Sequence, residues 1–444
     1  METYLKSCRD VLKGHMKNSS GQIHVVMGNE ACDIDSMVSA ITFAYFLSKT
    51  LDSRKAAVPV LNIQRAEFPL RSDGVFLLRE SGLSQDYLLF RDEVDLHSLQ
   101  NLALTLVDHN ILPEADRSLE DAVVEVIDHH RLERTPSPFC PITAETVGSC
   151  ATLVTERIVQ KAPELLDQQV AQLLYGTIIT DCVNMAPEAG KVTPKDSHYV
   201  VLLESRFPKL PPRSMLFQSL QNAKFDVSGL TTEQMLLKDM KTVSGGELKL
   251  AVSVIYMTLE DFLQRKCLQQ ELSEFCQKYN YNLLVAMTIS FIDNKEPHRQ
   301  IAVYSSSTCN RDEVIKALEK ARNPNLNLIP MSSPYTDVKA YTQGNTLASR
   351  KKVLPIILDF LKDRERKMEQ LEDLELEDES TQEQGNSQQC CEDTAMEEDT
   401  GVPPTPMNSL VEGCPLDNGL PKINTDVLVE KVRKIVSEED DDGP

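Results

Sequence analysis

Short runs of apolar and β-branched residues recur along the first part of the chain, and polar residues follow each run. The runs predict strands at residues 23–27, 58–63, 104–107 and 123–127, with a further strand expected at residues 73–78. Nearly continuous apolar runs of this length are typical of strands that are buried on both faces. The segments between them suit helices or loops, so the pattern predicts a doubly wound parallel sheet.

Helical spacing of apolar residues begins after Ser36, which is the predicted N-cap of that helix. Further helices are expected at residues 150–159 and 166–179. Thr193 and Pro194 are predicted to be the N-cap and first position of another helix. Prolines are frequent from Pro187 to Pro212, which indicates a joint between two domains.

A second alternation of strands and helices follows the joint. Strands are expected near residues 248–255, 283–289, 300–304 and 326–330, and helices near residues 231–240, 259–279, 311–321 and from about 350 to 362. The fold class is therefore predicted to be α/β, with a parallel-sheet domain over residues 1–205 and a smaller α/β domain over residues 206–365.

The net charge of −22 is concentrated at the end of the chain. Residues 368–444 contain 22 acidic and 4 basic residues, so the rest of the chain is nearly balanced. This acidic segment lacks aromatic residues, and we expect residues 366–444 to form a disordered interaction tail. Within it, residues 424–436 have loosely helical spacing, which suits either a helix formed on a partner or a fraying solvated helix.

Several function classes are disfavoured by composition. The balanced part has no basic stripe of the kind that nucleic-acid-binding proteins use, and no apolar run approaches the length of a membrane span. The first residues are charged and lack the apolar segment of a secretory signal. Eleven cysteines without Cys-x-x-Cys spacing are expected to be reduced thiols, which favours a cytoplasmic location.

Two of the predicted strands end in an acid that is followed by histidine. Asp108 follows one strand, and Asp128, His129 and His130 follow the next. The carboxyl ends of parallel strands form the ligand-binding edge of such sheets, so these side chains predict a metal site. The alternative is that they start ordinary turns, because Asp is common at strand exits.

Other acids and bases are weaker signals. Asp33 and Asp35 are two residues apart before a helix, where they suit either a divalent cation or the helix dipole. Asp181 closes an apolar stretch, and taken alone it suits a solvated position. Arg350 and Lys351 begin a predicted helix, where cations oppose the dipole, so they indicate either an anionic ligand or an exposed basic helix start.

Together these motifs resemble the DHH phosphoesterase superfamily, in the branch of family II pyrophosphatases, eukaryotic exopolyphosphatases and animal prune proteins. The motifs occur in the family's order at residues 29–36, 107–110, 128–130, 181 and 349–352, and the Pro-Pro-Thr-Pro-Met-Asn-Ser-Leu stretch of the tail is similar to that of animal prune proteins. A branch of exonucleases and oligonucleotidases fits less well, because Ser244-Gly245-Gly246-Glu247 lacks that branch's histidine.

The resemblance implies a site with two Mg²⁺ or Mn²⁺ ions. Its predicted metal ligands are Asn29, Asp33, Asp35, Asp108, His129 and Asp181. Asp108 would bridge the ions and take part in catalysis, and His130 would be a catalytic and substrate-binding residue. Arg350 and Lys351 would bind substrate from the second domain.

Two positions depart from the pyrophosphatase pattern, which has histidine at the position of Asn29 and lysines at those of Gly229 and Leu230. An amide oxygen is a weaker ligand than imidazole for transition metals, which moves the preference toward Mg²⁺. The lost cations should open the pocket to longer anions, with Lys224 as the expected substitute.

The implied function is an enzyme that hydrolyses acid anhydrides: a metal-dependent exopolyphosphatase of short-chain polyphosphates. Nucleotides are a second substrate class, with cyclic-nucleotide phosphodiesterase as a further activity. The resemblance also implies a regulatory tail that influences cell migration and proliferation, and a partner such as nucleoside diphosphate kinase. Nucleus and cell junctions are further expected locations. The alternative is a binding regulator that acts through the tail with weak or vestigial catalysis.

Overall fold

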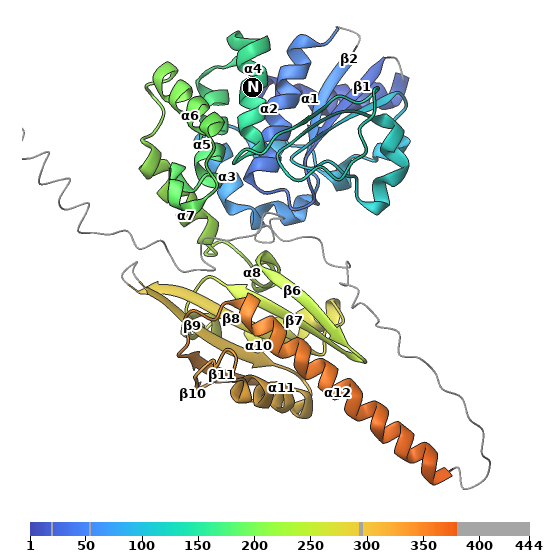
Figure 1. Ribbon diagram of the computed structural model, residues 1–444, viewed down its shortest axis with the longest axis vertical. Helices are drawn as coiled ribbons and strands as arrows, with labels where there is room; N and C mark the ends of the chain where they lie inside the picture. Colours follow the sequence, from blue (N-terminus) through green and yellow to red (C-terminus); the bar gives the residue numbers. More distant parts are fainter. Residues whose placement is uncertain (19–20, 53–54, 293–295, 380–444) are drawn as a thin grey trace, which may run out of the picture.

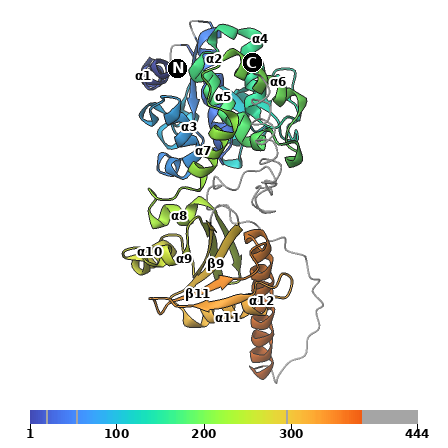
Figure 2. The same ribbon diagram turned by 90° about the vertical axis from the view of Figure 1, so that its left-hand side faces the viewer.

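The computed structural model has two α/β domains, which follow one another along its long axis (Figures 1 and 2). It describes residues 1–18, 21–52, 55–292 and 296–379. The predicted tail from residue 380 onward, including the expected helix at residues 424–436, lies outside the described residues.

In the described part of the chain, the first domain is built on a parallel sheet of five strands in the order β2-β1-β3-β4-β5. The strands are β1 (Gln22–Met27), β2 (Lys55–Val60), β3 (Leu102–Val107), β4 (Val123–Asp128) and β5 (Ile142–Ala144). The expected strands at residues 23–27, 58–63, 104–107 and 123–127 correspond to the first four, and β5 was not anticipated. The predicted parallel sheet is confirmed.

Helices cover both faces of this sheet. One face packs α2 (Ile34–Thr50), α4 (Cys150–Lys161) and α5 (Gln168–Asp181) into an apolar core, and α1 (Glu2–Asn18) covers the other face. The domain is completed by α3 (Ser72–Glu80), α6 (Pro194–Arg206) and α7 (Arg213–Phe225). Thr193 caps α6 through its side chain, and Pro194 is its first residue, as predicted.

Two local predictions in this domain were wrong. Residues 73–78 are in α3, because Gly74, Leu77 and Leu78 have the spacing of one buried helix face. The N-cap of α2 is Asp33 in place of Ser36, since the Asp33 side chain accepts the Ser36 backbone N–H. This difference places Asp33 at the start of the helix and therefore at the candidate site.

The second domain has a mixed sheet, with six strands among the described residues in the order β10-β11-β9-β8-β7-β6. Among the strands that the structure describes, only β7 and β8 pair in parallel. The strands are β6 (Met240–Gly245), β7 (Leu248–Ile255), β8 (Leu283–Ile292), β9 (Glu296–Tyr304), β10 (Leu328–Met331) and β11 (Val338–Gln343). The edge strand β6 and the inner strand β11 were not anticipated.

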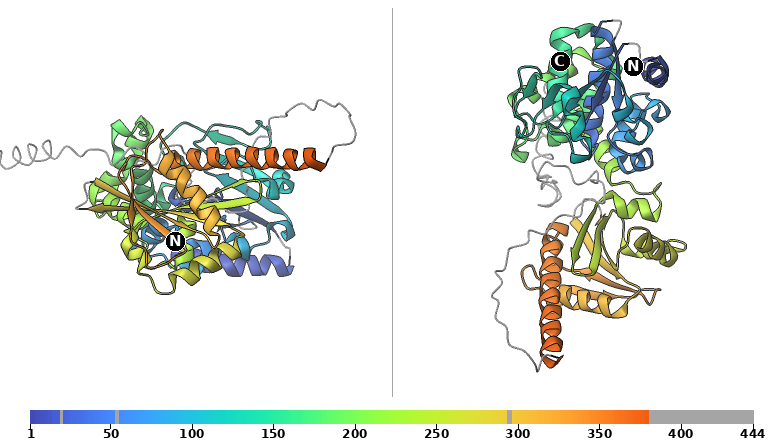
Figure 3. Two further views of the ribbon diagram at one scale, coloured as in Figure 1. Left: turned by 90° about the horizontal axis from the view of Figure 1, so that it is seen from below. Right: turned by 90° about the vertical axis from the view of Figure 1, so that its right-hand side faces the viewer.

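Its helices form two layers around this sheet. One core contains residues of α8 (Thr232–Lys238), α9 (Leu259–Leu263) and α10 (Leu268–Lys278), and the other contains residues of α11 (Thr308–Lys320) and α12 (Arg350–Glu379). The helix expected over residues 259–279 is two helices, because Cys267 has φ 61° between them. Figure 3 shows α12 as a long helix along one side of the domain.

The end of α12 corrects the predicted start of the tail. The helix was expected to end near residue 362, and disorder was expected from residue 366, yet α12 continues to Glu379. The added turns are rich in Glu and Leu, which are good helix formers. No helix within the described ranges is long and apolar enough to cross a membrane.

Candidate metal centre and active site

The predicted ligands from the two Asp-His motifs meet at the carboxyl end of the parallel sheet. Asp108 directly follows β3 and is 2% exposed, and its backbone N–H donates to the Ile127 carbonyl of β4 at 2.9 Å. His129 directly follows β4. Its Nε2 lies 3.2 Å from Asp108 Oδ1 and 3.7 Å from Asp35 Oδ2. The motifs therefore converge as the strand-end pattern predicted.

The other ring nitrogen fixes the orientation of His129. Nδ1 lies 2.9 Å from the Val147 carbonyl, to which it donates, so Nε2 faces the carboxylates. Histidines that bind metals commonly donate their second nitrogen to a carbonyl or carboxylate. Burial alone would lower the pKa of His129, but the hydrogen bond and charge of Asp108 and the charge of Asp35 raise it to about 11. A proton here balances charge in the way that a cation would.

Asp35 reaches this site from the first turn of α2 and is held by the start of α4. Its Oδ2 accepts the Cys150 N–H at 2.6 Å, and its Oδ1 accepts the Ala151 N–H at 2.8 Å. These amides belong to the first turn of α4, which carries the positive end of the helix dipole. Oδ1 also accepts a hydrogen bond from Ser39 Oγ at 3.2 Å, whereas Oδ2 accepts only from Cys150 among the described residues. Because a carboxylate oxygen has two lone-pair directions, Oδ2 retains acceptor capacity for a cation.

Asp33 and Asp181 join Asp35 and Asp108 in a group of four acids. We name these acids and His129 the metal cluster. Asp181 lies at the end of α5, where burial and the charges of Asp35 and Asp33 raise its pKa well above the usual value. Burial and Asp35 likewise raise the pKa of Asp33, and burial with Asp35 raises that of Asp108. Ionised acids are mutually destabilised here unless a cation is present. The oxygen-rich donor set with one imidazole fits Mg²⁺ or Mn²⁺.

Asn29 contacts the same cluster through its amide nitrogen. Nδ2 donates to the Asp108 carbonyl at 3.1 Å and to Asp108 Oδ2 at 2.9 Å, while Oδ1 accepts the Cys32 N–H at 3.1 Å. In this arrangement Asn29 holds Asp108 in place. Its role as a direct metal ligand remains a prediction.

His130 lies beside the cluster but has different partners. Its Nδ1 is 2.8 Å from Asp128 Oδ1 and 3.8 Å from Asp108 Oδ1. Asn110 Nδ2 donates to the second Asp128 oxygen at 2.5 Å. The buried Nε2 of His130 has no hydrogen-bond partner among the described residues. A histidine held in this way at one nitrogen presents the other to a ligand.

The pKa values of this pair differ from those of the cluster. Burial would raise the pKa of Asp128, but hydrogen bonds from His130 and Asn110 lower it to about 2. Burial would lower the pKa of His130, but the Asp128 hydrogen bond and the Asp108 charge raise it. His130 is therefore favoured as an imidazolium, which is the form that can donate a proton.

The predicted substrate-binding cations occupy two places. Lys224 lies in the last turn of α7. Its charge partly opposes the rise in the pKa of Asp33 that burial and the neighbouring acids cause. Arg350 begins α12, where its Nη1 donates to the Asp239 carbonyl at 2.7 Å and its Nη2 lies 2.6 Å from Asp239 Oδ1. Lys351 is exposed next to it. The structure thus brings Lys224 to the acids and ties Arg350 to its own domain.

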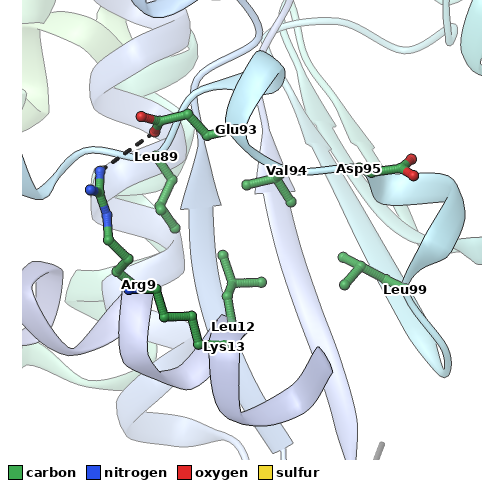
Figure 4. Close-up of a pocket in the computed structure, with 8 residues that line it drawn as sticks. All are labelled: Arg9, Leu12, Lys13, Leu89, Glu93, Val94, Asp95 and Leu99. Atoms are coloured by element: carbon green, nitrogen blue, oxygen red, sulfur yellow. Dashed lines mark ion pairs between the residues drawn. The ribbon is translucent and has the colours of Figure 1, made fainter. Parts of the chain in front are cut away.

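A pocket of about 230 Å³ lies elsewhere, between α1 and the segment before β3 (Figure 4). It is lined by Arg9, Leu12, Lys13, Leu89, Glu93, Val94, Asp95 and Leu99. Arg9 and Glu93 form an ion pair there at 3.5 Å. None of these residues belongs to the metal cluster, so this pocket is not the candidate active site.

Sequence reasoning missed the groups that hold the ligands. The Cys150 and Ala151 amides lie 115 and 116 residues from Asp35, and no local pattern relates them. Asn110 was visible in the Asp-His-Asn motif, but its contact with Asp128 depends on the strand order. Arg71, which donates twice to the Ala31 carbonyl in the Asn29–Asp33 loop, had no sequence signal.

Comparison with known families gives the class of protein. Residues 24–178 match the N-terminal domain of the DHH family, and residues 218–360 match the DHHA2 domain. The first match covers the parallel sheet and the metal cluster apart from Asp181, and the second covers the mixed sheet.

Individual relatives narrow the assignment. The chain is 50% identical to "Exopolyphosphatase PRUNE1" of Bos taurus, over 98% of this chain and 97% of that protein. It is 49% identical to the Homo sapiens protein of the same name, with the same coverage. It is also 30% identical, over 36% of this chain and 48% of the relative, to a "Manganese-dependent inorganic pyrophosphatase" of Methanocaldococcus jannaschii. The chain therefore belongs to the PRUNE1 family of DHH proteins.

Proposed function

We propose that this chain is a metal-dependent phosphohydrolase that cleaves phosphoanhydride bonds of short-chain polyphosphates. The observation that carries this proposal is the buried contact of His129 Nε2 with Asp108 Oδ1 at 3.2 Å, in a group of four acids beside His130. The names of the cattle and human relatives support this substrate class. Similarity to manganese-dependent pyrophosphatases supports a divalent metal.

Two Mg²⁺ or Mn²⁺ ions would be held by Asp33, Asp35, Asp108, His129 and Asp181. When bound, the ions supply positive charge at the scissile phosphoryl group and make the attacking water more acidic. The chain contributes carboxylates that are already oriented by α2 and α4, so little reorganisation is needed when substrate binds.

His130 is the proposed proton donor to the leaving oxygen. Its Nδ1 is fixed by Asp128, and its buried Nε2 is directed away from that bond. As water attacks phosphorus and the bridging P–O bond breaks, the Nε2 proton passes to the departing oxygen. The proton released by the attacking water then restores the imidazolium.

Positive charge for the substrate is proposed to come from Lys224, Arg350 and Lys351. Lys224 already influences Asp33, and Arg350 would add its guanidinium after exchanging part of its contact with Asp239. The functional units are proposed to be residues 1–205, residues 206–365 and the remaining segment. Phosphodiesterase activity, the tail's partners and effects, and the cytoplasmic location remain predictions.

The alternative is a binding regulator with vestigial catalysis. Four acids and an oriented histidine argue against it, because a decaying metal site tends to lose its mutually repelling acids, which destabilise the fold when no cation is bound. If the chain were a binding regulator, polyphosphate would bind to it without being hydrolysed.

The experiment is phosphate release from tripolyphosphate by the full chain with Mg²⁺ or Mn²⁺. Asp108→Asn should lower kcat by at least about a hundredfold, because it removes charge at the centre of the cluster. The matched control is Asp116→Asn, which changes another buried acid whose contacts are Arg91 and His97. Control turnover should stay within about threefold. Absence of turnover by the unmodified chain with either metal would refute the proposal.

A further inference from the structure

A lysine of the second domain contacts the first domain and is buried at the junction between them. Figures 1 and 2 show α7 and α8 near this junction. Lys238 ends α8 and is 1% exposed. Its Nζ donates to the Leu70 carbonyl at 2.6 Å and to Ser72 Oγ at 2.8 Å. In the first domain, a 3₁₀ helix (Arg65–Leu70) is followed directly by α3, which begins at Ser72. We name Leu70, Arg71 and Ser72 the junction segment.

The middle residue of the junction segment contacts the loop of residues 29–33, which we name the metal loop. Arg71 is 1% exposed, and its Nε and Nη2 donate to the Ala31 carbonyl at 3.0 and 2.9 Å. Ala31 lies between Asn29 and Asp33, two of the predicted ligands. A continuous set of buried contacts therefore connects Lys238 to the loop that carries these ligands.

The same junction contacts the segments that carry two of the proposed substrate-binding cations, Lys224 and Arg350. Ser72 Oγ donates to the Lys224 carbonyl at 3.4 Å. Asp239, the residue after Lys238, binds the Arg350 guanidinium. Leu70 also packs within the apolar core of the second domain. The junction segment thus contacts the metal loop on one side and the supports of Lys224 and Arg350 on the other.

Packing alone does not account for a lysine at this position. Burial lowers the pKa of Lys238 to about 8, an effect that Asp73 opposes and that Lys224 and Arg71 increase. Burying an ammonium group costs free energy that an apolar side chain of equal length would avoid. A methionine at this position could not donate the two hydrogen bonds that Lys238 makes across the junction.

We propose that Lys238 is a positioning residue that, through Arg71, sets the metal loop relative to the proposed substrate-binding cations Lys224 and Arg350. This inference rests on the proposed function, because it assigns a purpose to the alignment of metal and substrate sites. Loss of the Lys238 contacts would let the junction segment move, and Arg71 would then hold the Ala31 carbonyl less well.

The test is a calorimetric titration of the full chain with Mn²⁺. Arg71→Met should weaken Mn²⁺ binding by about tenfold, the lower range for loss of a residue that supports a ligand, and Lys238→Met by about threefold. The double variant should bind as weakly as Arg71→Met alone, because both changes act through one contact path. Lys241→Met, on the adjoining strand β6, is the matched control and should leave affinity unchanged.

Thermal unfolding of the metal-free variants separates this role from general destabilisation. If Lys238→Met does not fold, Ser72→Ala removes only one acceptor of Nζ and should weaken Mn²⁺ binding by about twofold. In the folded Lys238→Met variant, KM for tripolyphosphate should rise by a larger factor than kcat falls.

Two results would overturn the proposal. One is a folded Lys238→Met protein with unchanged Mn²⁺ affinity, and the other is a double variant whose loss equals the product of the single losses. Mn²⁺ binding is measured without turnover, so absence of phosphohydrolysis would refute the proposed function and leave this test valid.

Discussion

Two groups of acids lie side by side at the carboxyl end of the parallel sheet and have opposite electrostatics. In the metal cluster of Asp33, Asp35, Asp108, Asp181 and His129, burial and mutual repulsion raise the pKa of three carboxyls. In the adjacent Asp128–His130 pair, hydrogen bonds lower the pKa of Asp128 to about 2. The first group needs a cation, whereas the second already has its donors.

The difference separates the tasks of two neighbouring histidines. The rings of His129 and His130 are 4.4 Å apart between centroids, yet His129 directs Nε2 at the cluster and His130 directs Nδ1 at Asp128. These orientations support the proposed ligand role of His129 and the proposed proton-donor role of His130.

The largest effect on turnover or metal binding is expected from replacing each of these histidines singly. His130→Gln should lower kcat for tripolyphosphate by about a hundredfold or more, the usual size of general acid catalysis. It should leave the Mn²⁺ dissociation constant nearly unchanged. His129→Gln should instead weaken Mn²⁺ binding by at least about tenfold, since it removes a ligand.

Calorimetry and steady-state kinetics on the same preparations measure both quantities. Equal losses of Mn²⁺ affinity in the two variants would contradict the division of tasks and would make His130 a ligand as well.

A smaller effect is expected from Asp128→Asn. The imidazole of His130 remains, but its acidic partner is lost, so kcat should fall by about tenfold, less than in His130→Gln. If Asp128→Asn lowers kcat more than His130→Gln, the proton-donor role of His130 is wrong.

The difference in stability between the unmodified protein and the Asp128→Asn variant should change with pH. The folded-state pKa of Asp128 is below the ordinary value of 3.8, so its carboxylate stabilises the fold above about pH 4, and this contribution is lost as pH falls toward 2. The shift corresponds to roughly 2 kcal/mol. Urea unfolding of the metal-free proteins should show that difference at pH 7 and a smaller one at pH 3. A constant difference would contradict the pKa assignment.

The strand-end acids and histidines could be located from sequence because their signals are local. Apolar runs fix the ends of β3 and β4, and parallel strands place Asp108 and His129 at one edge of the sheet. The approach of Asp181 could not be derived from its own helix, and only the family resemblance assigned it to the site. Asp33 lies close enough to Asp35 for the Asp35 charge to raise its pKa, and it caps α2 where the sequence predicted Ser36 as the N-cap.

The supporting contacts could not be predicted, because they depend on packing between distant segments. Asp35 meets the start of α4, and Arg71 meets Ala31, over separations that no periodicity encodes. The same limit applies to Arg350, whose basic motif was visible but whose pairing with Asp239 was not. Local pattern also misassigned residues 73–78, where a short apolar run suits either a strand or a helix.

We propose that the metal cluster beside the Asp128–His130 pair holds two metal ions. The most direct test is the number of Mn²⁺ ions bound per chain at neutral pH, measured by calorimetry for the unmodified protein and for Asp108→Asn. We expect the unmodified chain to bind two Mn²⁺ ions. The variant should bind fewer ions or bind them much more weakly. A chain that binds no Mn²⁺, or that binds it equally well without the Asp108 carboxylate, would contradict the account.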